Sequence, residues 1–262
     1  MIAEVNGTSI HYLQTGSGPD VLLLPGLGAS THVWYAQMRA LSPVLRVTAV
    51  DLRGQGQSAK PEGPYSIRLL ADDVGALMGE LDLPPAVVVG SSMACMVAVE
   101  LAAAYPDRVS ALVLAGGFPR LEGPGRERME ARAVTAESEG MGPLAELVPA
   151  AALGALTHAA QPALVGLFRA LLLANDPHAY AASCRAIVGC DITPLLAEVR
   201  CPTLILLGEQ EQVAPWPAAR ALKAGIPHAD VRVLPNAGHL PFLEQPAAFN
   251  AALLEWLAGS LR

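Results

Sequence analysis

The chain has 262 residues, of which 52% are hydrophobic and 16% are charged. This composition is too apolar and too weakly charged for a disordered chain, and the length suits one large domain or a domain with an insertion. The formal net charge of -7 argues against nucleic-acid binding, which usually needs a basic face to meet phosphates. We therefore expect a folded protein that does not bind nucleic acid.

Short apolar runs alternate with helix-like segments in the first 118 residues and again after residue 201. The predicted strands are Ile10–Gln14, Val21–Leu24, Leu45–Val50, Ala86–Val89, Ala111–Ala115, Thr203–Leu207 and Val231–Leu234. The predicted scaffold helices are Ile67–Leu81, Cys95–Ala104 and Ala248–Leu257. This alternation predicts an α/β fold with a mainly parallel sheet and helices on both of its faces.

The alternation stops near Phe118 and resumes near Cys201, and alanine-rich helical segments without a strand pattern lie between them. A surface helical hairpin would fit this stretch. However, ligands in open α/β sheets bind at the carboxyl edge of the sheet, which favours a cap over that edge. We therefore expect a core domain of residues 1–118 and 201–262, with residues 119–200 inserted as a helical cap.

The positive mean hydropathy of +0.38 raises the question of a membrane span. Residues 147–168 carry no formal charge, and a spanning helix needs about 20 such residues. Prolines and polar residues interrupt the stretch, so we expect two short helices there and no membrane association. The N-terminus has no basic start followed by an apolar run, so no signal peptide is predicted and the expected location is the cytoplasm.

The cysteines, Cys95, Cys184, Cys190 and Cys201, show neither a CxxC pair nor a ligand-like spacing with histidine. We expect reduced, buried thiols. We also expect no metal and no cofactor. The sequence does not indicate an oligomeric state.

A serine lies on a predicted sharp turn between a strand and a helix. Ala86–Val89 runs into Gly90-Ser91-Ser92-Met93-Ala94, which matches the strand, turn and helix of a nucleophile elbow. Such a turn needs small residues two positions before and after the nucleophile, and Gly90 and Ala94 meet that need. Ser92 is therefore the candidate nucleophile, although a plain connection without a catalytic role would show the same short pattern.

A serine hydroxyl needs a positioned base to remove its proton. His239 follows the last predicted strand and precedes the final helix, where an imidazole can reach the edge of the sheet. An acid that orients the imidazole is expected after Thr203–Leu207, where the loop contains Glu209 and Glu211. The chain order of serine, acid and histidine suits this fold, and Glu211 is preferred because it lies further into the loop.

An oxyanion intermediate needs two hydrogen-bond donors, and we expect the backbone N–H groups of Met93 and Leu27 to supply them. The loop Pro25–Ser30 that contains the second donor also resembles a dinucleotide fingerprint, with Asp51 about 20 residues later. Thr31 stands where the third glycine of that fingerprint belongs. A dinucleotide site would also leave the serine, the acid and the histidine unexplained, so it is not favoured.

Together these motifs resemble those of the α/β-hydrolase superfamily over nearly the whole chain. They are Leu24-Pro25-Gly26-Leu27-Gly28, Asp51-Leu52-Arg53-Gly54-Gln55-Gly56-Gln57-Ser58, Gly90–Ala94, Gly208–Glu211 and Gly238-His239. In that family the acid commonly lies three residues after the glycine that ends its strand, which selects Glu211. The segments Leu171–Tyr180 and Leu243–Asn250 are similar to the 3-oxoadipate enol-lactonase group and its esterase relatives. The resemblance implies hydrolysis of a small-molecule carboxylic ester or lactone through a Ser-His-Glu triad.

Four positions depart from the family's pattern. Pro25 and Gln55 stand where histidines are common, Ala94 replaces a glycine, and Glu211 replaces the more frequent aspartate. None of these changes removes the nucleophile or the base. They leave open a specialised substrate or a weakened enzyme.

Substrate-binding residues are harder to identify from the sequence. Trp34 and Trp216 lie near the predicted site loops and are candidates, although either would also suit the core. Arg126, Arg128 and Arg132 begin the cap and could meet a substrate carboxylate or form a solvated helix face. Because the cap has few aromatic residues, we expect any aromatic pocket wall to come mainly from the core loops.

The same triad would also suit other activities. A carbon-carbon bond hydrolase, or a perhydrolase or haloperoxidase-like enzyme, could use it. A noncatalytic ligand-binding protein of the same fold is a third class.

Overall fold

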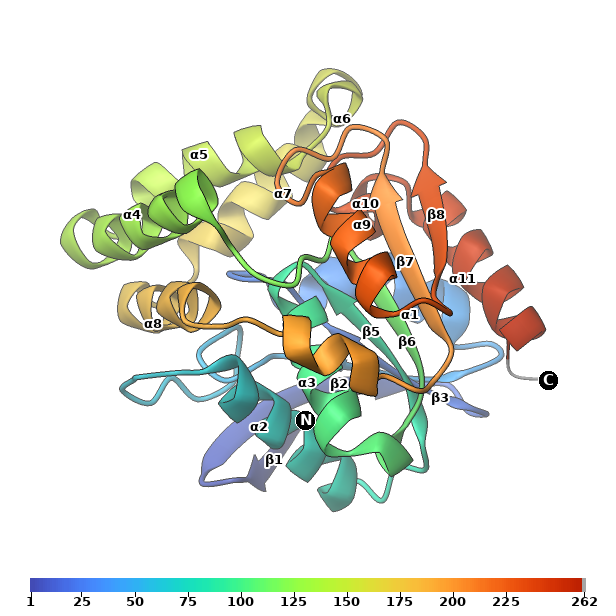
Figure 1. Ribbon diagram of the computed structural model, residues 1–262. Helices are drawn as coiled ribbons and strands as arrows, with labels where there is room; N and C mark the ends of the chain where they lie inside the picture. The colour runs from blue at the N-terminus through green and yellow to red at the C-terminus, as the bar shows by residue number, and fades with distance from the viewer. Residues whose placement is uncertain (261–262) are drawn as a thin grey trace.

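The computed structural model describes residues 1–260, which form an eight-stranded sheet flanked by helices (Figure 1). The strands are β1 (Ile2–Val5), β2 (Thr8–Thr15), β3 (Asp20–Leu24), β4 (Arg46–Val50), β5 (Ala86–Ser91), β6 (Val109–Ala115), β7 (Thr203–Gly208) and β8 (Asp230–Leu234). Their order across the sheet is β1-β2-β4-β3-β5-β6-β7-β8. β2 pairs antiparallel with β1 and β4, and all other pairs are parallel. The predicted mainly parallel sheet is confirmed.

Successive residues of the central strands pack into two hydrophobic cores, one on each face of the sheet. In β3, Leu22 and Leu24 belong to one core, whereas Val21 and Leu23 belong to the other. Burial on both faces explains why these strands are uniformly apolar in sequence. The helices that pack around the sheet are α1 (Tyr35–Leu41), α2 (Ile67–Glu80), α3 (Met93–Ala104), α9 (Trp216–Gly225), α10 (Pro241–Glu244) and α11 (Pro246–Ser260). Helices α2, α3 and α9 cover the first face, and α1 and α11 cover the second.

The N-terminal strand β1 was not predicted. It forms a hairpin with β2 through Asn6 and Gly7, which both have positive φ angles. An Asn-Gly pair is a strong hairpin signal because both residues tolerate that backbone conformation. The sequence therefore contained the signal, but β1 is short and its outward-facing residues are exposed.

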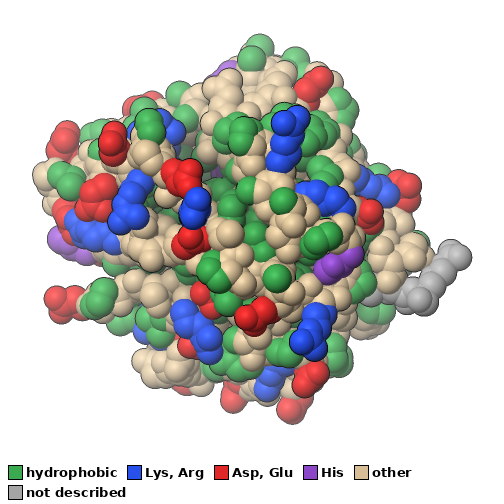
Figure 2. All heavy atoms as spheres, viewed as in Figure 1, with side chains coloured by type: hydrophobic (Ala, Val, Ile, Leu, Met, Phe, Trp, Pro, Cys, Tyr) green, Lys and Arg blue, Asp and Glu red, His purple; other side chains and the backbone are tan. Residues whose placement is uncertain are grey.

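The chain that connects β6 to β7 forms a group of helices, which lies on one side of the sheet (Figure 1). They are α4 (Gly123–Glu139), α5 (Gly142–Ala152), α6 (Ala155–Ala160), α7 (Pro162–Leu173) and α8 (Pro177–Val188). We call residues 119–200 the cap segment. Within it, α4 packs against α8 and α5 packs against α7. On the surface of α4 and α8, Arg185 pairs with Glu130 and Glu137, where Figure 2 shows charged side chains of both signs.

The uncharged stretch of residues 147–168 is divided among three helices, α5, α6 and α7, and not the two that were expected. Leu153 and Gly154 separate the first two, and Gln161 precedes Pro162 at the start of the third. Among residues 1–260, no helix combines the length and the apolarity that crossing a membrane requires. The four cysteines are free, and Cys95 and Cys184 are buried.

Candidate active site

Ser92 lies at the turn between β5 and α3. Its φ of 52° and ψ of -118° place it outside the regions that ordinary residues prefer, as in a nucleophile elbow. The turn is tight enough that a Cβ on Gly90 would come within 2.4 Å of the Ala94 carbonyl oxygen. Glycine is therefore required at position 90, and the methyl group of Ala94 is accommodated. The Ser92 N–H donates to the Ala115 carbonyl oxygen at 2.9 Å, which ties the turn to β6.

The loop after β3 approaches the serine closely. A Cβ on Gly26 would lie 3.1 Å from the Ser92 Cβ, so the backbone of this loop lies against the nucleophile turn. Leu27 follows in the same loop, and Met93 begins α3. The N–H of a first helical residue has no acceptor within its own helix. Both predicted oxyanion donors thus belong to backbone segments that flank Ser92.

His239 lies in the loop between β8 and α10. Its Nε2 is 2.9 Å from the Ser92 Oγ, and its Nδ1 is 2.7 Å from a Glu211 carboxylate oxygen. The imidazole packs tightly against Gly116, where a Cβ would be 2.9 Å from Nδ1. The His239 N–H donates to the Ala152 carbonyl oxygen of the cap segment at 2.8 Å. The structure therefore brings the three predicted residues into one hydrogen-bonded chain.

Glu211 lies in the loop after β7 and uses both carboxylate oxygens. Oε2 faces His239, whereas Oε1 accepts the N–H groups of Val213 at 2.7 Å and Ala214 at 3.0 Å. Burial works to raise the pKa of this carboxyl, but the attraction of His239 and the hydrogen bonds outweigh it and lower the pKa. An ionised carboxylate only accepts hydrogen bonds, so Nδ1 of His239 must carry its proton and Nε2 is left to accept from Ser92.

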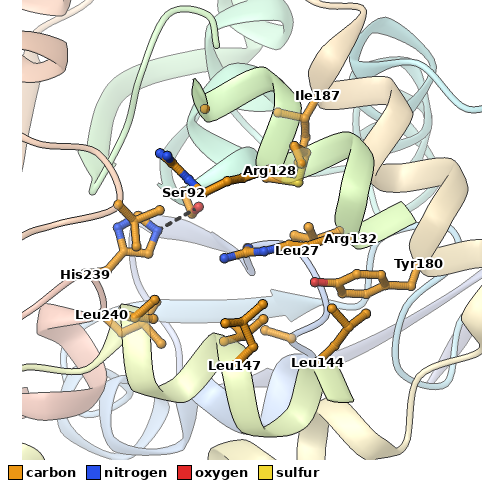
Figure 3. A pocket seen from close by; sticks show the side chains of 18 of the residues that line it. Leu27, Ser92, Arg128, Arg132, Leu144, Leu147, Tyr180, Ile187, His239 and Leu240 are labelled. Carbon is orange, nitrogen blue, oxygen red and sulfur yellow. Dashed lines mark hydrogen bonds between the residues drawn. The ribbon is translucent and has the colours of Figure 1, made fainter. Parts of the chain in front are cut away.

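A cavity of about 780 Å³ opens above Ser92 and His239, between the core and the cap segment. Its wall is largely apolar, with Leu144, Leu147, Val148, Leu240 and Phe242 among the lining residues. Figure 3 shows Arg128 and Arg132 pointing into this cavity from α4. In the described part of the chain, no cluster of three His, Cys, Asp or Glu side chains is suited to hold a metal ion. The site thus combines a serine and an imidazole with an apolar chamber and two cations.

The structure does not bring the predicted tryptophans to this cavity. Trp34 is completely buried and stacks on Phe242 with ring centroids 4.0 Å apart, because its large ring fills the core on the α1 and α11 face. Trp216 is 45% exposed at the start of α9 and is not among the residues that line the cavity. Neither tryptophan therefore lies in the cavity wall, where a substrate-binding residue was expected.

The aromatic part of the cavity wall also differs from the expectation. Phe118 and Phe242 come from the core, but Phe168 and Tyr180, the two aromatic residues of the cap helices, line the cavity as well. Burial raises the pKa of the Tyr180 hydroxyl, and the charge of Arg132 opposes that rise. The Tyr180 hydroxyl therefore remains protonated and neutral.

Gln55, at a position where the family commonly has histidine, supports the loop of Leu27. It is buried, and the end of its side-chain amide meets two carbonyl oxygens, those of Gly26 at 3.1 Å and Ala29 at 2.7 Å. Because both of these oxygens only accept hydrogen bonds, the amide must turn its NH₂ group toward them. Asp51 holds the end of the same loop by accepting the Thr31 N–H at 2.6 Å. From the sequence, Gln55 could be identified only as a departure from the family's pattern, because a contact between two loops leaves no periodic pattern.

Comparison with known proteins agrees with this fold. A 3-oxoadipate enol-lactonase from Acinetobacter baylyi is 28% identical over 94% of this chain and 91% of its own length. A Caulobacter sp. protein named "Putative carbamate hydrolase RutD" is 30% identical over 95% of each chain. The crystal structure of an enol-lactonase from Burkholderia xenovorans LB400 superposes with a TM-score of 0.94 at 32% identity, over 98% of this chain and 100% of that one. Residues 19–246 match the family model of the alpha/beta hydrolase fold, and with the elbow at Ser92 and the parallel sheet this shows that the chain belongs to the α/β-hydrolase family.

Proposed function

We propose that the protein is a serine hydrolase that cleaves a carboxylic ester or lactone through an acyl-enzyme. Ser92 is the nucleophile, His239 the general base and Glu211 the acid that orients the imidazole. The observation that carries the proposal is the pair of hydrogen bonds, 2.9 Å and 2.7 Å, that links these side chains in order. This arrangement activates a hydroxyl for attack on an acyl carbon.

In the proposed reaction, the Ser92 Oγ attacks the carbonyl carbon while Nε2 of His239 takes the hydroxyl proton. The oxyanion is held by the N–H groups of Leu27 and Met93. The bond to the leaving oxygen breaks as Nε2 returns the proton to it, and a lactone ring opens at this step. Water then attacks the acyl carbon while Nε2 of His239 takes a proton from it. The bond from that carbon to the Ser92 Oγ breaks as Nε2 returns the proton to Oγ, and the acid product leaves.

We further propose that residues 1–118 and 201–262 form the core domain and that residues 119–200 act as a cap that shapes the substrate chamber. The cap supplies one wall of the 780 Å³ cavity, and the core supplies Ser92 and His239. The names of the enol-lactonase relatives support a lactone or ester substrate. A volume of this size also accommodates an acyl group with a sizeable apolar part.

The cavity arginines favour substrates that carry an acidic group. Arg128 and Arg132 are one helical turn apart on α4, and neither takes part in a salt bridge within residues 1–260. Arg185 on the neighbouring helix, by contrast, pairs with two glutamates. Glu139 is the one acidic residue in the cavity lining as described. Two cations that no acidic side chain neutralises through a salt bridge, in an apolar chamber, are suited to bind a carboxylate.

The test of the catalytic assignment is covalent labelling of the purified protein with a fluorophosphonate, together with hydrolysis of a short p-nitrophenyl ester. We expect the wild type to label once and Ser92→Ala to remain unlabelled, with turnover reduced by several powers of ten. Near-normal esterase activity in Ser92→Ala would refute the assignment. A wild type that does not label would favour a noncatalytic ligand-binding protein.

The substrate class is tested by a panel. It should contain an enol-lactone, a neutral ester, a carbamate and a ring-cleavage dienone acid, and perhydrolysis should be followed by adding peroxide. For a half-ester of a dicarboxylic acid, Arg128→Gln and Arg132→Gln should each lower kcat/KM about 10 to 100-fold, since a hydrogen bond to a charged group contributes about 1.5–3 kcal/mol. For a neutral ester of the same length, kcat/KM should change little in both variants. Arg126→Gln is the matched control, because Arg126 lies on α4 outside the cavity lining.

A further inference from the structure

Glu244, at the end of α10, is a buried carboxylate with only 2% of its surface exposed. One oxygen, Oε2, accepts the Gly154 N–H and the Thr157 hydroxyl of the cap segment, each at 2.7 Å. The other oxygen, Oε1, accepts the N–H groups of Gly238 at 2.9 Å and Leu240 at 3.2 Å. A single carboxylate therefore joins the cap segment to the two residues that flank His239.

The backbone N–H groups of residues 238, 239 and 240 all have their acceptors within this junction. Those of Gly238 and Leu240 point to Glu244, and that of His239 points to the Ala152 carbonyl oxygen in the cap segment. The approach is close, since a Cβ on Gly238 would lie 2.6 Å from the Gly154 nitrogen. The loop that carries His239 is thus held by its contacts with Glu244 and with the cap segment, and not only by its connection to β8.

We propose that Glu244 is a positioning residue that holds the His239 loop against the cap, so that proton transfer at Ser92 depends on the cap being seated on the core. The inference rests on the proposed role of His239 as the base. Glu244 does not line the substrate cavity. Its effect on the reaction therefore runs through the position of the imidazole.

The physical reason is that four donors converge on one buried anion. Hydrogen bonds to an ionised acceptor are roughly twice as strong as neutral ones, and a buried carboxylate is stable only while its lone pairs are satisfied. If the cap were lifted from the core, Glu244 would lose two of its donors and His239 would lose its backbone partner at Ala152. The loop that carries the base would then have fewer constraints. A displacement of about 1 Å at a catalytic group costs on the order of 100-fold in rate.

The first variant is Glu244→Gln, which keeps the size of the side chain. Its amide presents one oxygen and one NH₂ group, so either the cap donors or the loop donors face another donor. We expect the rate of fluorophosphonate labelling and kcat for a p-nitrophenyl ester to fall about 100-fold, with KM changed less than threefold. The labelled fraction at completion reports how much protein is folded, whereas the rate reports the geometry of Ser92 and His239.

Glu209→Gln is the matched control. Glu209 is an exposed carboxylate that accepts the N–H of Asn236 in the same loop between β8 and α10 at 3.1 Å. We expect its labelling rate to stay within about twofold of the wild type. If Glu244→Gln labels completely and as fast as Glu209→Gln, the inference is wrong. If the wild type itself does not label, the proposed function fails and not this inference alone.

A milder pair of variants covers the case in which Glu244→Gln does not fold. Thr157→Val removes one donor from the cap side of the carboxylate and keeps the side-chain shape, while Thr157→Ser keeps the hydroxyl. We expect Thr157→Val to slow labelling and kcat about 10-fold and Thr157→Ser to stay within about threefold of the wild type. Equal rates in both variants at wild-type level would overturn the coupling between the cap and the base.

Discussion

Replacement of the proposed triad acid by its amide, Glu211→Gln, should reverse the orientation of the proton on His239. The Oε1 position of Glu211 accepts two backbone N–H groups, from Val213 and Ala214. The oxygen of a glutamine will occupy that position, because an NH₂ group there would face two donors. The NH₂ group must then point to Nδ1 of His239, which the carboxylate contacts at 2.7 Å in the wild type.

With a donor at Nδ1, the neutral imidazole carries its proton on Nε2, which then faces the Ser92 hydroxyl and cannot accept its proton. A change from acid to amide in a serine-histidine-acid triad lowers kcat about 10⁴-fold, or about 5.4 kcal/mol in the activation free energy. KM should change little, since Glu211 does not line the cavity. The assay is hydrolysis of a p-nitrophenyl ester at pH 7 to 8, with the labelled fraction used to count active sites.

Two controls distinguish the tautomer from damage to the fold. Thermal unfolding should show Glu211→Gln folded, because the glutamine oxygen keeps both backbone hydrogen bonds. Glu211→Asp restores the charge but is one methylene shorter, and we expect it to retain 10 to 1000 times more activity than the amide. A folded Glu211→Gln that keeps more than about a tenth of wild-type kcat would refute the reasoning.

Three further outcomes are expected. The pKa of Glu211 is lowered in the fold, so its contribution to stability is present above its ordinary pKa of about 4.5 and is lost as the pH falls toward the lowered value. Urea unfolding at pH 7 and pH 4 should therefore show a smaller gap between wild type and Glu211→Gln at pH 4, and an equal gap would contradict the lowered pKa. Trp34→Ala should lower the free energy of unfolding by about 3–5 kcal/mol, whereas Trp216→Ala should change it by no more than about 0.5 kcal/mol. The kcat/KM of the folded protein should stay nearly unchanged in both variants. A selective rise of KM in either variant would return that residue to the substrate site. Gly208→Ala should destabilise the fold by about 3 kcal/mol, since its Cβ would lie 2.1 Å from the rigid Gly238 carbonyl oxygen, and a melting temperature within 2 °C of wild type would show that the backbone yields.

The fold and the chain order of the proposed triad could be predicted because both leave local patterns. Buried strands are continuous apolar runs, and Ser92 follows such a run in β5. His239 follows the partly exposed edge strand β8, whose alternating apolar and polar residues are also a local strand pattern. The strand β1 was missed although its Asn-Gly turn is a local signal. Its alternating pattern covers only four residues, and half of them are exposed. The roles of Trp34 and Trp216 could not be predicted, because burial in the core and exposure to a cavity select the same side chain.

Contacts between distant segments are the part that the sequence does not reveal. Glu244 belongs to a tail segment that carried the family resemblance, but its four donors come from residues 154, 157, 238 and 240. No periodicity or spacing marks such a junction. The direction of Arg128 and Arg132 was equally open, since a helix face that meets solvent and one that meets a cavity have the same pattern.

The cap holds the His239 loop partly through main-chain atoms, and this affects how the sequence can diverge. The Ala152 carbonyl and the Gly154 N–H contact His239 and Glu244 whatever side chains their neighbours carry. Side chains on α4, α5 and α7 that line the chamber can therefore be exchanged without removing those two contacts. Selection or engineering for a new substrate has access to most of the cap wall, provided that the backbone turn between α5 and α6 keeps its shape.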